Sequence, residues 1–169
     1  MMHYALLLVI AIAAQLGRMP RIPPRPKALA VLPISIAMTV KTAAGESRAS
    51  VAPGKAPVEP RAVAAVKPGE KPQIRWQVRN MHPKLPVRNV VIHFLVTRQE
   101  KAGEAVPASS RKGSVMDSVI GTDLSPKQAV SGSQNTALWE PGSYLVEVEI
   151  LDPQGNRRHY CIAELLVGA

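Results

Sequence analysis

The sequence predicts an all-β fold, an antiparallel β-sandwich, and three observations support this prediction. Four separate runs in the C-terminal half alternate apolar and polar residues with a period of two, which is typical of strands with one buried face. Turn-forming residues separate these runs. No convincing helical pattern occurs; only 125–130 could form one helical turn, with Ser125 as its cap and Pro126 at the first helical position.

The strand expected at 74–80 has one apolar and one basic face. Its apolar residues alternate with Arg75, Gln77 and Arg79, and Asn80 ends the run. We expect Trp76, in the middle of the apolar face, to lie in the core, where its replacement by alanine would be costly. The three residues of the basic face are a candidate partner-binding surface.

Three further strands are expected downstream. The run at 87–97 places Phe94 on its apolar face and His93 on the other, and the run at 158–167 has a mixed pattern. In the run at 143–151, Tyr144 lies on the apolar face. Glu147 and Glu149 lie opposite, and we interpret them as part of a solvated outer face rather than as paired catalytic carboxylates. Turns with Pro, Gly or Asp join these strands at 80–86, 139–144 and 152–156.

A long polar stretch, 97–119, lies between two of the strands. Loops of this length in compact domains are usually functional or mobile. One interpretation is that this loop, with Arg111 and Lys112, meets a partner together with the basic strand face. The alternative is a disordered insertion.

Residues 1–49 are expected to be a signal-like leader. They contain two apolar runs of 13 residues, 4–16 and 28–40, and each is shorter than the roughly 20 residues of a membrane-spanning helix. A basic segment, 18–27, precedes the second run, and small residues around Ala44 and Ala49 follow it, as at a signal-peptide cleavage site. The first 18 residues would not belong to the protein if Met19 were the true start. We expect a secreted, periplasmic or cell-envelope protein; the alternative is an uncleaved, membrane-inserted hairpin of both runs.

Residues 50–72 are expected to be a linker. Five prolines in this segment favour an extended spacer over a packed element. Within it, 62–66 could form the first edge strand of the folded domain, which is expected at 73–169.

Charge and cysteine content exclude several classes of protein. The net charge is +9, but residues 1–72 hold ten Lys/Arg against three Asp/Glu, whereas 73–169 hold eleven against nine. Because the folded part is nearly balanced, we expect no nucleic-acid binding. Cys161 is the only cysteine, so a disulfide within the domain and a CxxC site are excluded. A lipid-modified cysteine of a bacterial lipoprotein is also excluded, because that residue directly follows the signal segment, whereas Cys161 lies near the C-terminus.

No motif for an enzyme or a cofactor is present. There is no nucleophile elbow, no P-loop and no dinucleotide-binding glycine motif, and we expect no cofactor. His159 and Cys161 would share one strand face. An alternative function is therefore a small secreted metal-binding protein or enzyme that uses His93, His159 and Cys161.

Three quoted segments carry a resemblance to a known family. KPGEKPQIRWQVRN, LPVRNVVIHFLV and WEPGSYLVEVEILDPQGN together resemble bacterial immunoglobulin-like domains of the cell-adhesion-related (CARDB) and fibronectin-III-like type. The resemblance implies a disulfide-free sandwich, Trp76 as core tryptophan, and Tyr144 as a tyrosine corner whose hydroxyl caps a neighbouring connection. It also implies a non-enzymatic binding or assembly module for a protein or an envelope polymer. A subunit of an envelope complex held by its N-terminal runs remains a further alternative.

Overall fold

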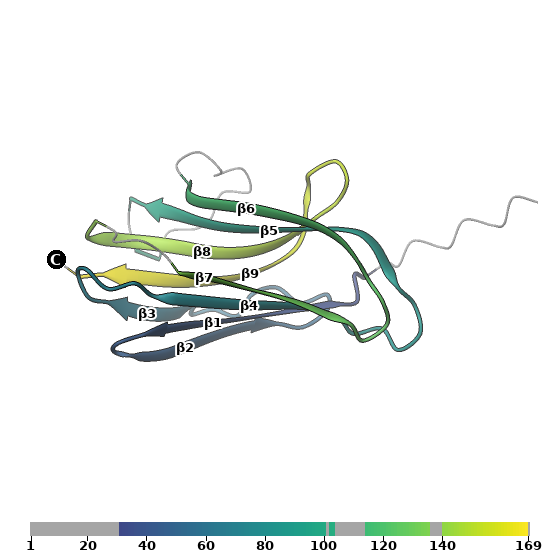
Figure 1. Cartoon of the computed structure of the whole chain (residues 1–169), viewed down its shortest axis with the longest axis horizontal. Coiled ribbons are helices and arrows are strands. Elements are labelled where there is room, and N and C mark those ends of the chain that lie inside the picture. Colours follow the sequence, from purple (N-terminus) through teal and green to yellow (C-terminus); the bar gives the residue numbers. More distant parts are fainter. Residues whose placement is uncertain (1–30, 101, 104–113, 136–139, 169) are drawn as a thin grey trace, which may run out of the picture.

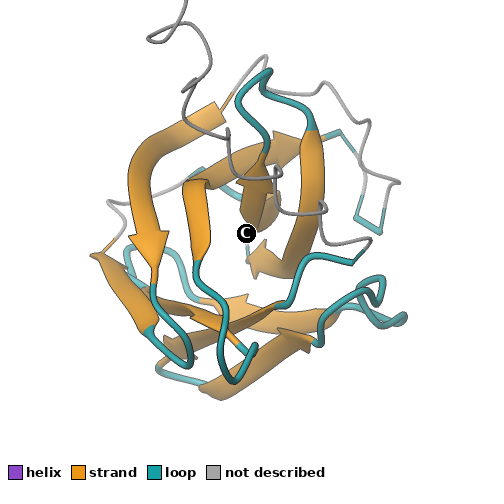
Figure 2. Ribbon diagram, turned by 90° about the vertical axis from the view of Figure 1, so that its right-hand side faces the viewer, coloured by secondary structure: helices purple, strands orange, loops and turns teal. Residues whose placement is uncertain are grey.

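The computed structural model describes residues 31–100, 102–103, 114–135 and 140–168. These residues form nine strands in two sheets that pack face to face (Figure 1). The view along the strands shows the two curved layers (Figure 2). The predicted all-β sandwich is confirmed. The described ranges contain no helix, and so none long and apolar enough to cross a membrane.

The two sheets have four and five strands. The four-stranded sheet has the order β2-β1-β4-β7 and the five-stranded sheet the order β3-β9-β8-β5-β6. The strand bounds are β1 Ile34–Thr42, β2 Gly45–Val51, β3 Ala62–Val66, β4 Gln73–Asn80, β5 Val87–Gln99, β6 Ser114–Leu124, β7 Ala129–Asn135, β8 Gly142–Leu151 and β9 Arg157–Val167. The four strands expected from the sequence correspond to β4, β5, β8 and β9.

The sandwich begins well before residue 73, where the sequence analysis placed its start. Most of the run 28–40, interpreted as a signal-peptide core, belongs to β1, which lies between β2 and β4. The residues at alternate positions of β1 are buried between the sheets: Ile34, Ile36, Met38 and Val40. A cut near Ala44 or Ala49 would therefore remove a central strand. The first apolar run, 4–16, and Met19 lie outside the described residues.

The expected linker contributes one strand. Residues 62–66 form β3, an edge strand as anticipated, but it pairs in parallel with β9. The sandwich is therefore not wholly antiparallel. The remaining strand pairs of both sheets are antiparallel.

Two edge strands, β6 and β7, come from segments for which the sequence analysis predicted no strand. The segment between them does not form a helical turn; the Gln128 N–H donates to the Ser125 carbonyl over 3.1 Å, which closes a tight turn. Part of the polar stretch 97–119 thus extends β5 and begins β6. Arg111 and Lys112 lie outside the described residues.

Trp76, Phe94 and Tyr144 all lie in the core between the sheets, at most 3% exposed. The Tyr144 hydroxyl donates to the Glu140 carbonyl over 2.7 Å, the arrangement that the tyrosine-corner resemblance implies. Trp76 extends under the neighbouring edge strand, where it pairs with Gly132. A Cβ at Gly132 would lie 2.3 Å from the indole ring, so only glycine fits there.

Asn80 connects three segments at the end of β4. It is fully buried, and its Nδ2 donates to the carbonyls of Leu85, Leu124 and Ser125 at 2.9, 3.1 and 3.1 Å. Its Oδ1 accepts from the His82 N–H over 2.9 Å. The asparagine thus joins the β4–β5 connection to the β6–β7 turn, and its buried amide is satisfied by backbone groups of both.

We predict that Trp76→Ala lowers the free energy of unfolding by at least about 3 kcal/mol, because it removes a buried ring and leaves a cavity beneath β7. Chemical denaturation followed by circular dichroism measures the change. Gln77→Ala, which alters the exposed neighbour, should stay within about 0.5 kcal/mol of the parent. A Trp76→Ala protein as stable as the parent would contradict this packing.

Candidate functional site

The outer face of the four-stranded sheet carries the predicted basic residues. Because buried and exposed positions alternate along β4, its apolar residues point into the core and Arg75, Gln77 and Arg79 point outward, where all three are exposed. Lys41 of β1 and Arg48 of β2 share this surface and are also exposed. We call these five residues the basic face.

Strand register sets the spacing within the basic face. One row across the sheet runs from Arg48 through Thr39 and Arg75 to Ser133. Strands lie about 4.8 Å apart, so the backbones at Arg48 and Arg75 are about 10 Å apart, and Arg75 and Arg79 are about 13 Å apart along β4. The positive charges are therefore distributed over the sheet rather than gathered at one point.

Small and polar side chains fill the space between these charges. The next row holds Ser50, Ala37, Gln77 and Ser131, and the Gln77 amide donates to the Ser131 hydroxyl over 3.3 Å. A shallow hollow of about 550 Å³ opens here. It is lined by Ala37, Thr39, Arg75, Trp76, Gln77, Ser131, Gly132 and Ser133. The hollow exists because β7 contributes only glycine and serines to this part of the sheet.

The charges of the basic face are largely uncompensated. Glu46 is the one acidic residue on the four strands, and it pairs with Arg48 over 2.5 Å. Among the described residues, Arg75 and Arg79 form no ion pair. The large apolar side chains found exposed in the described part of the chain also lie elsewhere, on none of β1, β2, β4 or β7. The face thus offers cationic and hydrogen-bonding groups without an apolar anchor.

Sequence reasoning missed Lys41, Arg48 and the β7 residues of this surface. The first two fell in the segments interpreted as leader, although Ile34–Val40 has the period-two pattern of a strand. The polar loop expected to act with the basic face is flanked by β5 and β6, which belong to the other sheet.

The outer face of the five-stranded sheet differs from the expectation. Glu147 and Glu149 are each only 2% exposed, so their interpretation as solvated residues is wrong. Arg157 lies against both, with its Nη2 at 2.9 Å from Glu147 and in contact with Glu149. Alternation shows which face a residue occupies but not whether that face is covered, and here Arg157, itself mostly buried, helps to cover it.

From Glu149 on β8, a chain of polar contacts continues to His93 on β5 and Asp117 on β6. His93 Nε2 lies 2.6 Å from Asp117 Oδ1, and His93 Nδ1 lies 3.4 Å from Glu149. Burial raises the pKa of Glu147 to about 7, and the nearby Arg157 guanidinium only partly opposes this shift. Because both glutamates are covered, a substrate could not reach them without movement of these side chains.

The residues of the alternative metal or enzyme hypothesis do not come together. His93 lies on the outer face of the five-stranded sheet, whereas His159 and Cys161 lie on its inner face. Burial lowers the pKa of His159 and raises that of the Cys161 thiol to about 11. No group of three or more potential metal-ligating side chains occurs within the described ranges.

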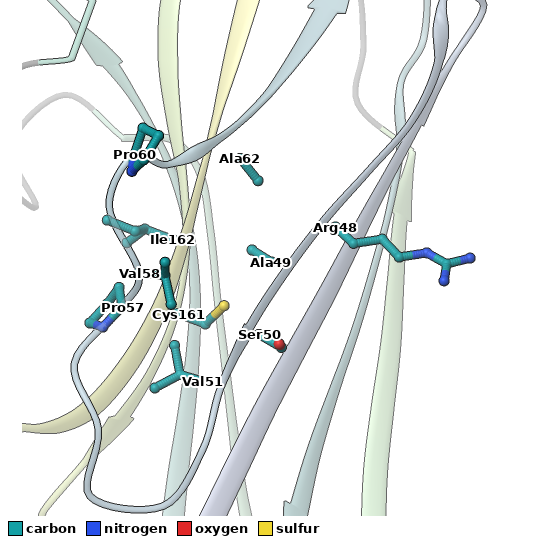
Figure 3. Close-up of a pocket in the computed structure, with 10 residues that line it drawn as sticks. All are labelled: Arg48, Ala49, Ser50, Val51, Pro57, Val58, Pro60, Ala62, Cys161 and Ile162. Atoms are coloured by element: carbon teal, nitrogen blue, oxygen red, sulfur yellow. The ribbon is translucent and has the colours of Figure 1, made fainter.

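Cys161 lines a pocket of about 300 Å³ at the side of the sandwich, between β2, β9 and the segment before β3 (Figure 3). Its sulfur points toward Ala49, whereas the Arg48 guanidinium points away from the pocket. Apolar residues such as Val51, Val58 and Ile162 form much of the lining. The pocket therefore places the thiol among apolar groups and not beside a base that could activate it.

No protein-family model and no curated protein matches the sequence. Among solved structures, the chain is similar to one titled "Crystal structure of the C-terminal domain of wzt". The identity is 10%, the match covers 78% of this chain and 71% of that chain, and the TM-score is 0.43. A likeness at this level assigns no function to either face of the sandwich.

We predict that Glu147→Gln changes the pH dependence of stability. The folded protein binds the Glu147 proton more tightly than the unfolded chain does, so this contribution is full below pH 4.5 and is lost as the pH rises through about 7. Relative to the parent, the variant should gain roughly 2–3 kcal/mol between pH 5 and pH 8. Denaturant titrations at both pH values test this, and a pH-independent difference would refute it.

We predict that Cys161 in the folded protein resists thiol reagents. The side chain is fully buried, and a pKa of about 11 instead of 9.0 lowers the thiolate fraction at pH 8 by about 100-fold. Ellman's reagent should therefore react slowly with the native protein and rapidly in denaturant. Equal rates in both states would show that the thiol is accessible.

Proposed function

We propose that this protein is an exported, non-enzymatic immunoglobulin-like module of the CARDB type that binds an anionic polymer of the cell envelope through its basic face. The observation that carries the proposal is the exposure of Arg75 and Arg79 on the outer face of the four-stranded sheet, where neither has an acidic partner among the described residues. An acidic protein surface is the second candidate partner.

The positive charge of the basic face supports an anionic partner. Arginine presents several donors in a planar fork that suits carboxylate and phosphate groups, and Arg75 and Arg79 have no acidic partner among the described residues that would compete. Their spacing of about 13 Å suits a ligand with repeated charges better than a single small anion.

The composition between the charges favours a polar polymer over a protein. Protein interfaces usually depend on aromatic or large apolar anchors at their centre. The described part of this face exposes no such residue and instead offers hydroxyl and amide groups, including Ser131, Ser133 and Gln77. These groups suit hydrogen bonds to a hydrated chain that lies across the sheet.

Burial and separation of the reactive groups support a non-enzymatic role. Glu147 and Glu149 are covered and paired with Arg157. His93 is on the opposite side of its sheet from His159 and Cys161. None of these groups is presented to the hollow on the basic face.

Export is part of the proposal and now rests on the first apolar run, 4–16, since most of the second run belongs to β1. The length of the first run suits the apolar core of a signal peptide. An exported module with this surface would meet its partner outside the cytoplasm, in the periplasm, the envelope or the surrounding medium.

Charge reversal tests the proposal. Heparin serves as the anionic polymer and dextran as the neutral one, and binding is measured by calorimetry at two salt concentrations. We expect Arg75→Glu/Arg79→Glu to weaken heparin binding at least about tenfold, and added salt to weaken binding by the parent.

A matched control separates the face from net charge. Arg88 and Arg158 are exposed on the other sheet, and Arg88→Glu/Arg158→Glu changes the net charge by the same amount. This control should retain most of the affinity. Equal losses in both double variants would show that only overall charge matters, and the basic face would then have no special role.

A further inference from the structure

The pocket beside Cys161 lies at the side of the sandwich where β2, the edge strand of one sheet, faces β9 of the other. Residues 52–61, which connect β2 to β3, run across this side and contribute Pro57, Val58 and Pro60 to the lining (Figure 3). We call residues 52–61 the strap. The two sheets and the strap together bound a space of about 300 Å³.

Small side chains on the facing walls leave this space open. Ala49 of β2, Ala62 of β3 and Cys161 of β9 all line it, and the Cys161 sulfur points toward Ala49. Pro57 and Pro60 lack the amide N–H with which the strap could pair with the outer edge of β2. The strap accordingly forms no strand and crosses from β2 toward β3 as an irregular segment.

The lining presents no charged group to the interior of the pocket. Arg48 is the one charged residue of the lining, and its guanidinium points away from the pocket (Figure 3). The raised pKa of about 11 keeps the Cys161 thiol neutral at pH 7. Hydrogen-bonding groups are present as well, because β2 pairs only with β1 among the described strands, and every second residue of an edge strand directs its backbone N–H and C=O away from its neighbour. The pocket thus suits a neutral, largely apolar molecule that forms one or two hydrogen bonds.

The volume of the pocket indicates the size of this molecule. At about 300 Å³ the pocket has roughly twice the volume of an engineered apolar cavity in another protein that binds benzene, and this space corresponds to two fused rings. Protein interiors are close-packed, so a molecule that fills the space supplies dispersion contacts that the walls otherwise lack. A rigid ring compound also loses less conformational entropy on binding than a flexible chain of the same volume.

We propose that this pocket is a binding site for a small neutral compound of two fused rings that is apolar except for one hydrogen-bonding group. The pocket lies on the inner side of β2, because Ala49 and Val51, which line it, point toward the core. The basic face is on the outer side of the same strand. The two sites are therefore separate, and this one does not require the proposed function.

Indole is the probe, because it has two fused rings and a single N–H donor. Calorimetric titration of the full-length chain should show one site with a dissociation constant of roughly 0.1–1 mM, as expected for so small a ligand. Because indole binds the folded protein, a saturating concentration should also raise the midpoint of thermal unfolding. Absence of saturable binding at up to roughly 5 mM indole would overturn the proposal.

A pocket-filling variant locates the site. Ala49→Leu places a larger side chain in the space toward which the Cys161 sulfur points, and it should raise the dissociation constant for indole at least about tenfold. Ala37→Leu is the matched control, because it makes the same exchange at an exposed, outward position of the adjacent strand β1. This control should bind indole like the parent. Equal affinities of the two variants would show that indole binds elsewhere and would overturn the proposal.

The Cys161 thiol provides a second test in the parent protein, which does not depend on the folding of any variant. Cys161 is the only cysteine, and methyl methanethiolsulfonate is a small neutral reagent for it. At an indole concentration about ten times the dissociation constant, only about one protein molecule in eleven is free of indole, so labelling of the native protein should slow about tenfold. The slowing should be absent in denaturant, where the pocket no longer exists. A native labelling rate that indole leaves unchanged, or an equal slowing in denaturant, would contradict binding beside the thiol.

Discussion

The packing of Trp76 against Gly132 is the contact on which the basic face depends. Val130 is the one residue of β7 among the apolar side chains that pack on the core, so the position of this edge strand relies largely on its hydrogen-bonded register with β4 and on the indole beneath it. Glycine at 132 allows the ring to approach the strand closely. The contact between Trp76 and Gly132 on the inner face of the sheet thus helps to set where Ser131 and Ser133 lie relative to Arg75 on its outer face.

The charged residues on the two outer faces of the sandwich differ in their exposure to solvent. On the four-stranded sheet the arginines are exposed to solvent. On the five-stranded sheet Glu147 and Glu149 are removed from water, and Arg157 recovers only part of the lost hydration energy. Arg157 also stacks over the Tyr160 ring at 4.5 Å from its centroid, which holds the guanidinium over this region. One face is therefore available to a partner, whereas the other is closed by its own side chains.

Much of the fold could be predicted from the sequence, but the N-terminal strands could not. An apolar run of 13 residues after a basic segment satisfies the pattern of a signal-peptide core as well as that of a buried strand. Only the pairing of β1 with β2 on one side and β4 on the other distinguishes the two. For the same reason, β6 and β7 could not be found locally: they contain many small and polar residues and are strands because longer neighbours, β5 and β4, supply their hydrogen-bond partners.

The sequence by itself determined which side chains of β4 would be hidden and which exposed, because a strand turns successive residues to opposite sides whatever surrounds it. Arg75, Gln77 and Arg79 follow from this local rule. Only the tertiary structure decided that Lys41 and Arg48 share their surface, that Glu147 is covered, and that His93 is separated from Cys161 by a sheet. These facts depend on which strands become neighbours and what covers each sheet, and such contacts join residues far apart in the chain that no local pattern connects.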